Sequence, residues 1–164
     1  MRRKTILGLV CLLVLPAWAA AGTKISGTVV CSKPDPTYSL PAADATKHNF
    51  VIGKNTCTWP KPMEIGGART KEDAFTTFEE VHGETSRGLG FAVGTLTSGD
   101  QFHVRTQGKA ILNTDGGVKT SEGTWTFEAG TGKIKGIEGG GTYKCAGKPE
   151  GLTCDVSGDY TVPK

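Results

Sequence analysis

The segment 78–84 holds the densest group of titratable side chains in the sequence. Glu80 and His82 are two residues apart, so they share one face if this segment is a strand. Burial raises the pKa of a carboxyl group and lowers that of an imidazole, and a buried pair of this kind can transfer a proton. A two-residue loop at Ser86-Arg87 would point the pair into the core, whereas a loop of odd length would leave His82 in solvent. Glu80 and His82 are therefore candidate acid–base residues.

No other constellation of reactive residues stands out. His48 and His103 are far from His82 in the sequence, and no C-x-x-C or H-x₃-H spacing occurs, so we predict no metal site and no cofactor. The motifs G-x-S-x-G, H-E-x-x-H and S-x-x-K are absent, and the stretch Gly130–Lys133 lacks the rest of a phosphate-binding loop. The standard hydrolase classes and nucleotide binding therefore have no support.

Aromatic and threonine side chains on the expected strands are candidates for contact with a small hydrophobic ligand. Such ligands bind in concave sites lined by apolar and aromatic groups, with a few polar groups that fix orientation. The candidate ligand-binding residues are Trp59, Phe78, Phe91, Thr95, Thr106 and Trp125.

Residues 1–21 have the features of a signal peptide. Three basic residues, Arg2, Arg3 and Lys4, are followed by a short apolar stretch and then by small residues. Two A-x-A cleavage sites occur, ending at Ala19 and at Ala21, and we favour the second. Removing these residues leaves as many basic as acidic side chains, so the net charge gives no argument for nucleic acid. No later segment is apolar enough to span a membrane. The sequence predicts one domain over residues 22–164, exported to the periplasm or the cell exterior.

Four cysteines lie in the predicted mature chain. An even number in an exported protein is typical of disulfides. Cys145 and Cys154 flank a turn-rich stretch and can face each other across a hairpin, so we pair them, which leaves Cys31 with Cys57.

Short alternating segments between glycine turns predict an all-β fold. Three matching pieces are typical of an up-and-down antiparallel sheet: Gly123-Thr124-Trp125, Gly141-Thr142-Tyr143 and Gly158-Asp159-Tyr160. Gly108 falls opposite Gly123 in the expected register, as at a barrel corner. Because about seven or eight strands have no helix to cover them, we predict a closed β-barrel, with a β-sandwich as the alternative.

Two loops set the expected register. Ser98–Gln101 has the glycine of a type II′ turn, and Thr114–Gly117 has the Asp-Gly of a type I′ turn. Counting from them places Val93 opposite Thr106, Thr106 opposite Trp125, and Lys109 opposite Glu122. The resulting core face contains Phe91, Val93, Thr95, Phe102, Val104, Thr106, Trp125 and Phe127.

A family resemblance covers residues 88–145. Three stretches resemble small exported bacterial proteins of unknown function: Gly123–Phe127, Gly130–Ile137 and Gly139–Tyr143. Those proteins are in turn similar to the calycin-type and allene oxide cyclase-like barrel group. The resemblance implies a strand, a tight turn and a short helical turn before the next strand. It implies no chemistry, because the group contains cyclases, binding proteins and uncharacterised members, and no catalytic residue of the plant cyclases has a match here.

Taken together, the sequence predicts an exported barrel that binds a small hydrophobic ligand or has a structural role. One alternative is a cofactor-free cyclase or isomerase that acts in the barrel lumen through Glu80 and His82. The other is a surface-associated interaction protein. The sequence alone leaves these three open, together with the oligomeric state.

Overall fold

The computed structural model describes residues 22–44 and 47–163, so the predicted signal peptide lies outside the described residues. These residues form an all-β fold with a single short 3₁₀ helix, η1 (Gly132–Ile134), before the last two strands. The strands are β1 (Thr23–Ser32), β2 (Thr37–Pro41), β3 (His48–Lys61), β4 (Glu64–Ile65), β5 (Ala68–His82), β6 (Thr85–Leu96), β7 (Gln101–Leu112), β8 (Val118–Gly130), β9 (Glu138–Lys148) and β10 (Gly151–Thr161). No helix among them is long and apolar enough to cross a membrane.

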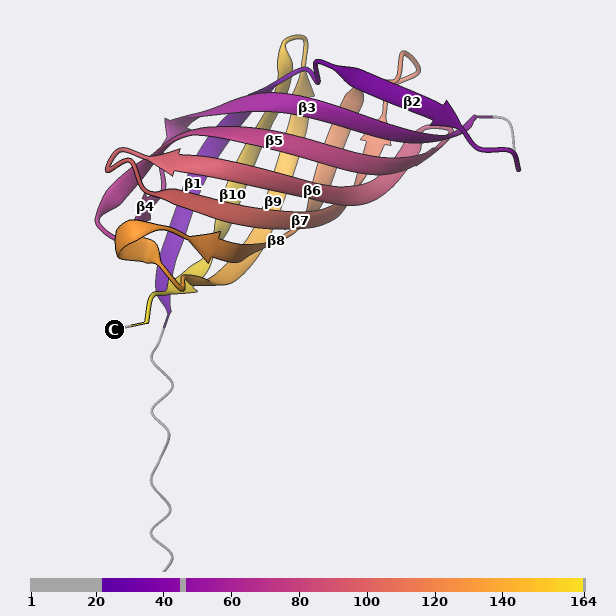
Figure 1. Ribbon diagram of the computed structural model, residues 1–164. Helices are drawn as coiled ribbons and strands as arrows, with labels where there is room; N and C mark the ends of the chain where they lie inside the picture. The colour runs from indigo at the N-terminus through magenta and orange to yellow at the C-terminus, as the bar shows by residue number, and fades with distance from the viewer. Residues whose placement is uncertain (1–21, 45–46, 164) are drawn as a thin grey trace, which may run out of the picture.

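Eight antiparallel strands close into a barrel, which confirms the predicted fold (Figure 1). The strand order is β3-β1-β10-β9-β8-β7-β6-β5, and β5 pairs back onto β3 to complete the ring. β2 and β4 are short additions at the two ends of this series. β2 pairs in register with the start of β3, with residues 37–41 opposite residues 49–53.

Apolar side chains fill the end of the barrel where the described part of the chain begins and ends (Figure 1). Ile65 after the β3–β4 connection and Ile134 of η1 are almost completely buried there. The helical turn at η1 is the one that the family resemblance implied. The cluster packed at this end is Ile25, Met63, Ile65, Leu96, Phe102, Trp125, Phe127, Ile134 and Ile137.

Glycines facing the interior make room for the large side chains. A Cβ atom on Gly94 would lie 2.0 Å from Cζ of Phe102, and one on Gly90 would lie 2.3 Å from Cζ of Phe75. A Cβ atom on Gly108 would lie 2.0 Å from the Tyr143 hydroxyl. Real Cβ atoms do not approach other atoms so closely, so each ring occupies the space that its facing glycine leaves. The barrel interior is filled by side chains at these levels.

The register of β7 and β8 matches the prediction. Thr106 lies opposite Trp125 and Gly108 opposite Gly123. Lys109 also lies opposite Glu122, and their charged atoms are 3.1 Å apart.

The predicted register of β6 against β7 is wrong. Val93 lies opposite His103 instead of Thr106, which is a shift by an odd number of residues and turns the face of β6 over. Phe91 and Val93 are consequently 50% and 40% exposed on the outside, and Thr95 shares that outer face by alternation. The inward positions of β6 hold Gly90, Ala92, Gly94 and Leu96.

The loop after β6 explains the error. Gly99 has φ +88°, its N–H donates to the carbonyl of Leu96, and the Leu96 N–H donates to the carbonyl of Asp100. This is a three-residue loop whose last residue has the left-handed conformation, rather than the two-residue type II′ loop expected.

Both predicted disulfides form. Cys31 bonds Cys57 and Cys145 bonds Cys154, each between directly opposed residues of neighbouring strands. The four cysteines are buried and pack with Val29 into a second cluster. Two disulfides fit a protein that folds in an oxidising compartment.

Candidate functional site

The hairpin between β5 and β6 directs Glu80 and His82 outward. Its loop is Gly83-Glu84, with φ +58° at Gly83, so His82 lies opposite Thr85 and Glu80 opposite Arg87. The alternative loop at Ser86-Arg87, which would have turned the pair into the core, does not form, and the pair has the outward position that the sequence analysis left open. The His82 side chain is 50% exposed and that of Glu80 is 23% exposed.

His48, which the sequence analysis left aside, joins this pair on the outer face. β3 and β5 place His48 directly opposite His82, and the two imidazole rings stack with centroids 3.7 Å apart. The backbone around His48 is held from two sides, because its carbonyl accepts from the Ala42 N–H and the Lys47 carbonyl accepts from the Gly83 N–H. Unlike His82, the His48 side chain is only 7% exposed.

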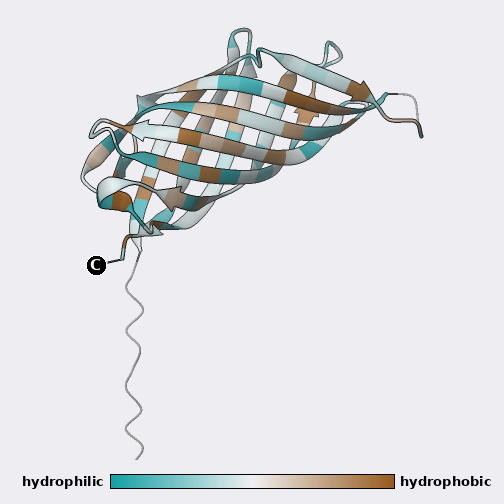
Figure 2. Cartoon of the chain, in the orientation of Figure 1, coloured by the Kyte–Doolittle hydropathy of each residue, from teal (hydrophilic) through white to brown (hydrophobic). Residues whose placement is uncertain are grey.

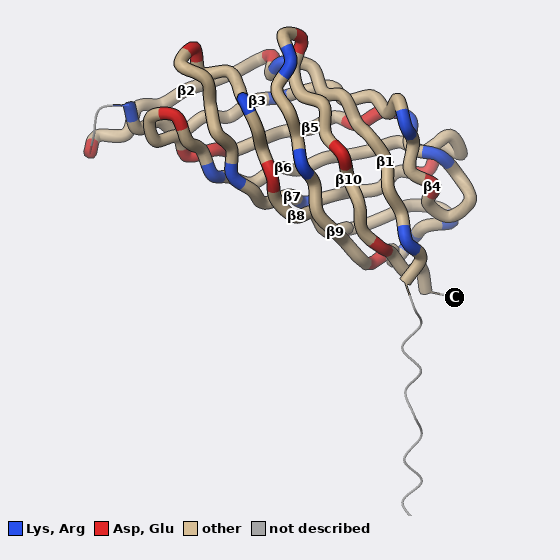
Figure 3. The backbone as a smooth tube through the Cα atoms, turned by 180° about the vertical axis from the view of Figure 1, so that it is seen from behind, with Lys and Arg blue, Asp and Glu red and all other residues tan. Residues whose placement is uncertain are grey.

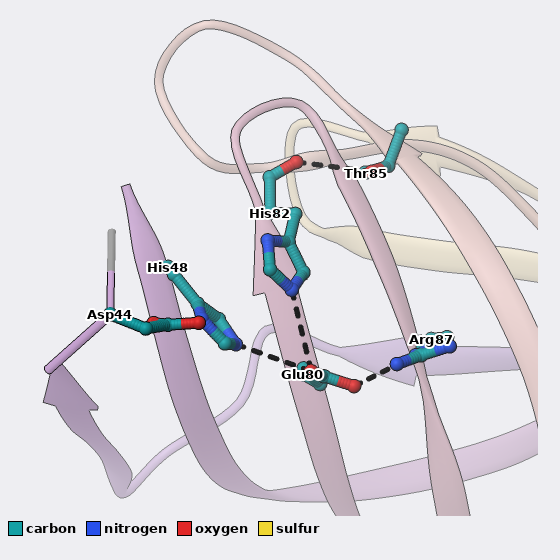
Figure 4. A network of polar contacts seen from close by, with 6 residues as sticks. All are labelled: Asp44, His48, Glu80, His82, Thr85 and Arg87. Atoms are coloured by element: carbon teal, nitrogen blue, oxygen red, sulfur yellow. Dashed lines mark hydrogen bonds and ion pairs between the residues drawn. The ribbon is translucent and has the colours of Figure 1, made fainter. Parts of the chain in front are cut away.

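The polar atoms of these three residues converge on one carboxylate oxygen (Figure 4). Oε1 of Glu80 lies 3.2 Å from Nε2 of His48 and 3.3 Å from Nε2 of His82. Oε2 of Glu80 accepts a hydrogen bond of 2.7 Å from Nε of Arg87. On the far side of His48, its Nδ1 lies 2.6 Å from Oδ1 of Asp44. We call His48, Glu80 and His82 the outer cluster.

Charge on the outer cluster is set mainly by Arg87. Its hydrogen bond, together with a smaller contribution from the hydrogen bond of His82, lowers the pKa of Glu80 to about 2. The hydrogen bond with His48 likewise lowers the pKa of Asp44. Both carboxylates are therefore ionised at neutral pH, and each can only accept hydrogen bonds. It follows that Nδ1 of His48 carries the proton that Asp44 accepts.

An apolar surface begins beside the outer cluster and runs over four strands, whose hydrophobic positions are coloured brown in Figure 2. Ile52 lies opposite both Tyr38 and Phe78, and Phe78 lies opposite Leu89, so one row crosses β2, β3, β5 and β6. Exposed fractions reach 67% for Tyr38 and 47% for Phe78. We call this surface the apolar face; its residues are Tyr38, Leu40, Phe50, Ile52, Phe78, Leu89, Phe91 and Val93.

The opposite wall of the barrel is polar (Figure 3). There Lys24 forms an ion pair of 2.7 Å with Asp159, and Thr28 donates a hydrogen bond to Asp155. Charges of both signs alternate over β1, β9 and β10 in that view. Of the seven large hydrophobic side chains that are exposed in the described residues, six belong to the apolar face and the seventh, Ile111, lies on β7.

The six candidate ligand-binding residues do not form one site. Trp59, Thr106 and Trp125 point into the barrel, where Trp125 is 4% exposed and packs edge-on against Phe127. Phe78, Phe91 and Thr95 point outward, and the guanidinium of Arg105 lies 5.7 Å from the centre of the Phe91 ring. The wall of the barrel separates the two groups.

Near the β5–β6 hairpin, Glu79 and not Glu80 lies on the inner side of β5. Its Oε2 accepts a 2.8 Å hydrogen bond from Ser86 in a partly buried position. Tyr143 lies nearby in the interior, and burial raises the pKa of its hydroxyl. The lumen chemistry that the sequence analysis assigned to Glu80 and His82 would have to use these inner groups instead.

Asp73 is a buried carboxyl group inside the barrel. Oδ2 accepts a hydrogen bond of 3.1 Å from Nε1 of Trp59, whereas Oδ1 has no hydrogen-bond partner. Burial raises the pKa of Asp73 to about 6. Because the folded protein holds this proton more tightly than the unfolded chain, Asp73 stabilises the fold fully below pH 3.8 and loses that contribution as the pH rises through 6.

We expect Asp73→Asn to remove this pH dependence. The loss in the wild type amounts to about 2.4 kcal/mol between pH 4 and pH 7, since one pKa unit corresponds to about 1.4 kcal/mol and part of the effect already lies below pH 4. Asparagine keeps an acceptor for Trp59, so the variant should be the more stable protein at pH 7. Urea unfolding at several pH values measures the difference, with the exposed Asp155→Asn as control. Equal slopes for wild type and Asp73→Asn over this range would contradict the expectation.

Long-range pairing explains what the sequence analysis missed. His48 lies far from His82 in the chain, and only the closing pair β3–β5 brings them together. One local signal was available for the β5–β6 hairpin, because Gly83 is the first residue of a two-residue loop, the same pattern that was assigned to Gly99. Using it would have placed Glu80 opposite Arg87.

Comparison of the chain with protein-family models, with curated proteins and with solved structures found no match. The similarity to calycin-type and allene oxide cyclase-like barrels therefore stays a prediction.

Proposed function

We propose that this is an exported binding protein that recognises an apolar surface of another protein through its apolar face. The observation that carries the proposal is the gathering of exposed aliphatic and aromatic side chains on one wall of a disulfide-bonded barrel. Exposed fractions of 68% for Leu40, 50% for Phe91 and 46% for Ile52 would be unfavourable in water without a partner.

The shape of the apolar face favours a macromolecule over a small ligand. A small ligand needs a concave site that covers most of its surface. The apolar face lies on the convex outside of the barrel, and the interior is filled where Phe75, Phe102 and Tyr143 pack over glycines. A small hydrophobic ligand in the lumen, or a cyclase reaction there, would require these side chains to move.

The border of the apolar face is typical of a protein interface. Glu80 and Arg87 form an ion pair beside Phe78, and Arg105 lies over Phe91. An apolar centre with a polar rim is the usual arrangement in protein–protein interfaces. Charges of both signs occur on this rim, which favours a protein partner over an anionic lipid surface.

The free edge of β2 is poorly suited to pairing with another strand. The carbonyls of Pro36 and His48 accept hydrogen bonds that align β2 with β3 and leave Pro41 facing the free side. Proline has no N–H to donate, and it commonly protects sheet edges. The partner is therefore expected to contact the face of the sheet and not its edge.

Site-specific crosslinking tests the proposal. A photoreactive phenylalanine analogue is placed at position 78, at position 91 or, as control, at the exposed position Thr124 on β8, in the protein exported by its source cell. We expect positions 78 and 91 to give the same protein adduct and position 124 to give none. The partner identified by mass spectrometry is then purified, and calorimetry should show at least tenfold weaker binding to Phe78→Ser than to Thr124→Ser.

Three outcomes would overturn the proposal. Adducts formed only with a second copy of the chain would assign the apolar face to self-association, and adducts with lipid would assign it to a membrane surface. Equal crosslinking at position 124 would show that the contacts are unspecific.

A further inference from the structure

We propose that His48, Glu80 and His82 form a binding site for a divalent transition-metal ion such as Zn²⁺ on the outside of the barrel. One ligand atom from each of the three residues lies within 4.8 Å of the others. Two imidazole nitrogens and one carboxylate oxygen are a ligand set that zinc commonly takes in proteins. The inference is independent of the proposed protein partner.

Two of the three spacings between the ligand atoms match those around a tetrahedral metal. Bonds from zinc to nitrogen and oxygen are about 2.0–2.1 Å long, so neighbouring ligands of a tetrahedral ion are about 3.3 Å apart. The distances from Oε1 of Glu80 to Nε2 of His48 and to Nε2 of His82 are 3.2 Å and 3.3 Å. The carboxylate oxygen therefore lies at a ligand-to-ligand distance from both imidazoles.

The second observation is a buried nitrogen without a hydrogen bond. Nε2 of His48 is inaccessible to solvent and has no hydrogen-bond partner, although Oε1 of Glu80 is close. Burying such a group costs free energy unless something binds its lone pair. A metal ion in front of Nε2 would do so, and it would also separate this lone pair from the facing carboxylate.

Asp44 prepares His48 for this role. Because the Asp44 carboxylate accepts the proton on Nδ1, it is Nε2, on the side of Glu80, that offers a lone pair to a metal ion when the ring binds one. Metal-binding histidines usually donate their other N–H to a carboxylate or carbonyl in this way, which fixes the tautomer and the ring orientation.

Arg87 leaves one oxygen of Glu80 free. It binds Oε2, while Oε1 faces the histidines and can act as a single-oxygen ligand. His82 has to turn, because its ring is stacked on that of His48 and the lone pair of a metal ligand lies in the ring plane. Its 50% exposed side chain has room for this rotation, whereas His48 is fixed.

The ligand types also select the metal. Imidazole nitrogens favour zinc, copper and nickel, whereas magnesium and calcium prefer sites made of oxygen atoms. Three protein ligands leave a fourth position for water or for a donor atom of another molecule. All four cysteines of residues 22–163 are in disulfides, so no thiolate in this part of the chain competes for the ion.

Calorimetric titration of the purified, oxidised mature protein with ZnCl₂ tests the site. We expect one zinc ion per chain and no binding of MgCl₂ under the same conditions. His82→Ala should weaken zinc binding at least tenfold, and the exposed His103→Ala, which removes an imidazole from the same outer wall, should leave it unchanged. Native mass spectrometry should show the mass of one zinc ion on wild type and on His103→Ala.

Two further variants distinguish a residue that binds the metal directly from one that only orients a metal ligand. Glu80→Gln keeps the size of the side chain and should also weaken binding at least tenfold, with an unchanged circular dichroism spectrum. Asp44→Asn should weaken binding less than His82→Ala, because it changes only the group behind His48. Wild type that binds no zinc, or that binds it no more tightly than His82→Ala does, would overturn the proposal.

Discussion

Replacing Gly94 with leucine is expected to prevent the barrel from folding. A Cβ atom at this position would lie 2.0 Å from Cζ of Phe102 and 2.5 Å from Oδ1 of Asp73. Phe102 is 2% exposed and is surrounded by the apolar cluster that includes Ile134 of η1, so its ring has no free space into which it can move. Overpacking of this kind costs several kcal/mol, which is comparable to the whole stability of a small domain.

Ala74→Leu on the neighbouring strand provides the matched control. Ala74 is exposed on the outer face of β5, so the same side chain should change the unfolding free energy by less than about 0.5 kcal/mol there. Far-ultraviolet circular dichroism and thermal unfolding compare the two variants. A Gly94→Leu protein that folded with an unchanged melting temperature would mean that the interior is not filled, and it would restore the hypothesis of a ligand in the lumen.

Removal of the Cys31–Cys57 disulfide is expected to cost more stability than removal of the Cys145–Cys154 disulfide. The two bonds close loops with sequence separations of 26 and 9. In the chain-entropy description, these loops correspond to about 3.5 and about 2.6 kcal/mol of stabilisation. Urea unfolding of the two double Cys→Ala variants measures both values. The reverse order would show that strain or packing, and not loop length, decides the contribution of each bond.

The sequence was sufficient for the architecture because several independent signals agreed. These signals all belong to strands β7–β10 and their hairpins. They are the alternation around Trp125 and Phe127, the facing glycines at positions 108 and 123, and the spacing of Cys145 and Cys154. In this region the structure confirms both the register and the Cys145–Cys154 pairing. Local turns and cross-strand partners lie close together in the chain there, so counting residues was enough.

The hydrophobic pattern of β6 did not reveal the wrong register, because the inner residues of that strand are the small ones. Gly90, Ala92 and Gly94 face the core, whereas Phe91 and Val93 face solvent, which is the reverse of the pattern expected for a half-buried strand. Rings from neighbouring strands supply the missing volume. A hydrophobic pattern read from one strand cannot show this, because the side chains that fill the space are contributed by other strands.

Both loops used to set the register have a three-residue form, yet the pairing differs from the predicted one only at the loop between β6 and β7. Gly116 has φ +83°, its N–H donates to the carbonyl of Asn113, and the Asn113 N–H donates to the carbonyl of Gly117. An irregularity between Ile111 and Leu112 adds a residue to β8 and restores the pairing that a two-residue loop would give. No such compensation occurs between β6 and β7.

The position of β1 in the ring has a consequence for the order of folding. β1 pairs with β3 on one side and with the last strand, β10, on the other, so that Lys24 and Asp159 meet although 135 positions separate them in the sequence. Contacts of such high sequence separation form late, because closing the intervening loop costs entropy before any contact repays it. We therefore expect the hairpins from β5 to β10 to assemble first and the seam between β1 and β10 to close last. In a chain that becomes available from its N-terminus onward, β1 would lack its pairing partner β10 until the C-terminal residues are also present.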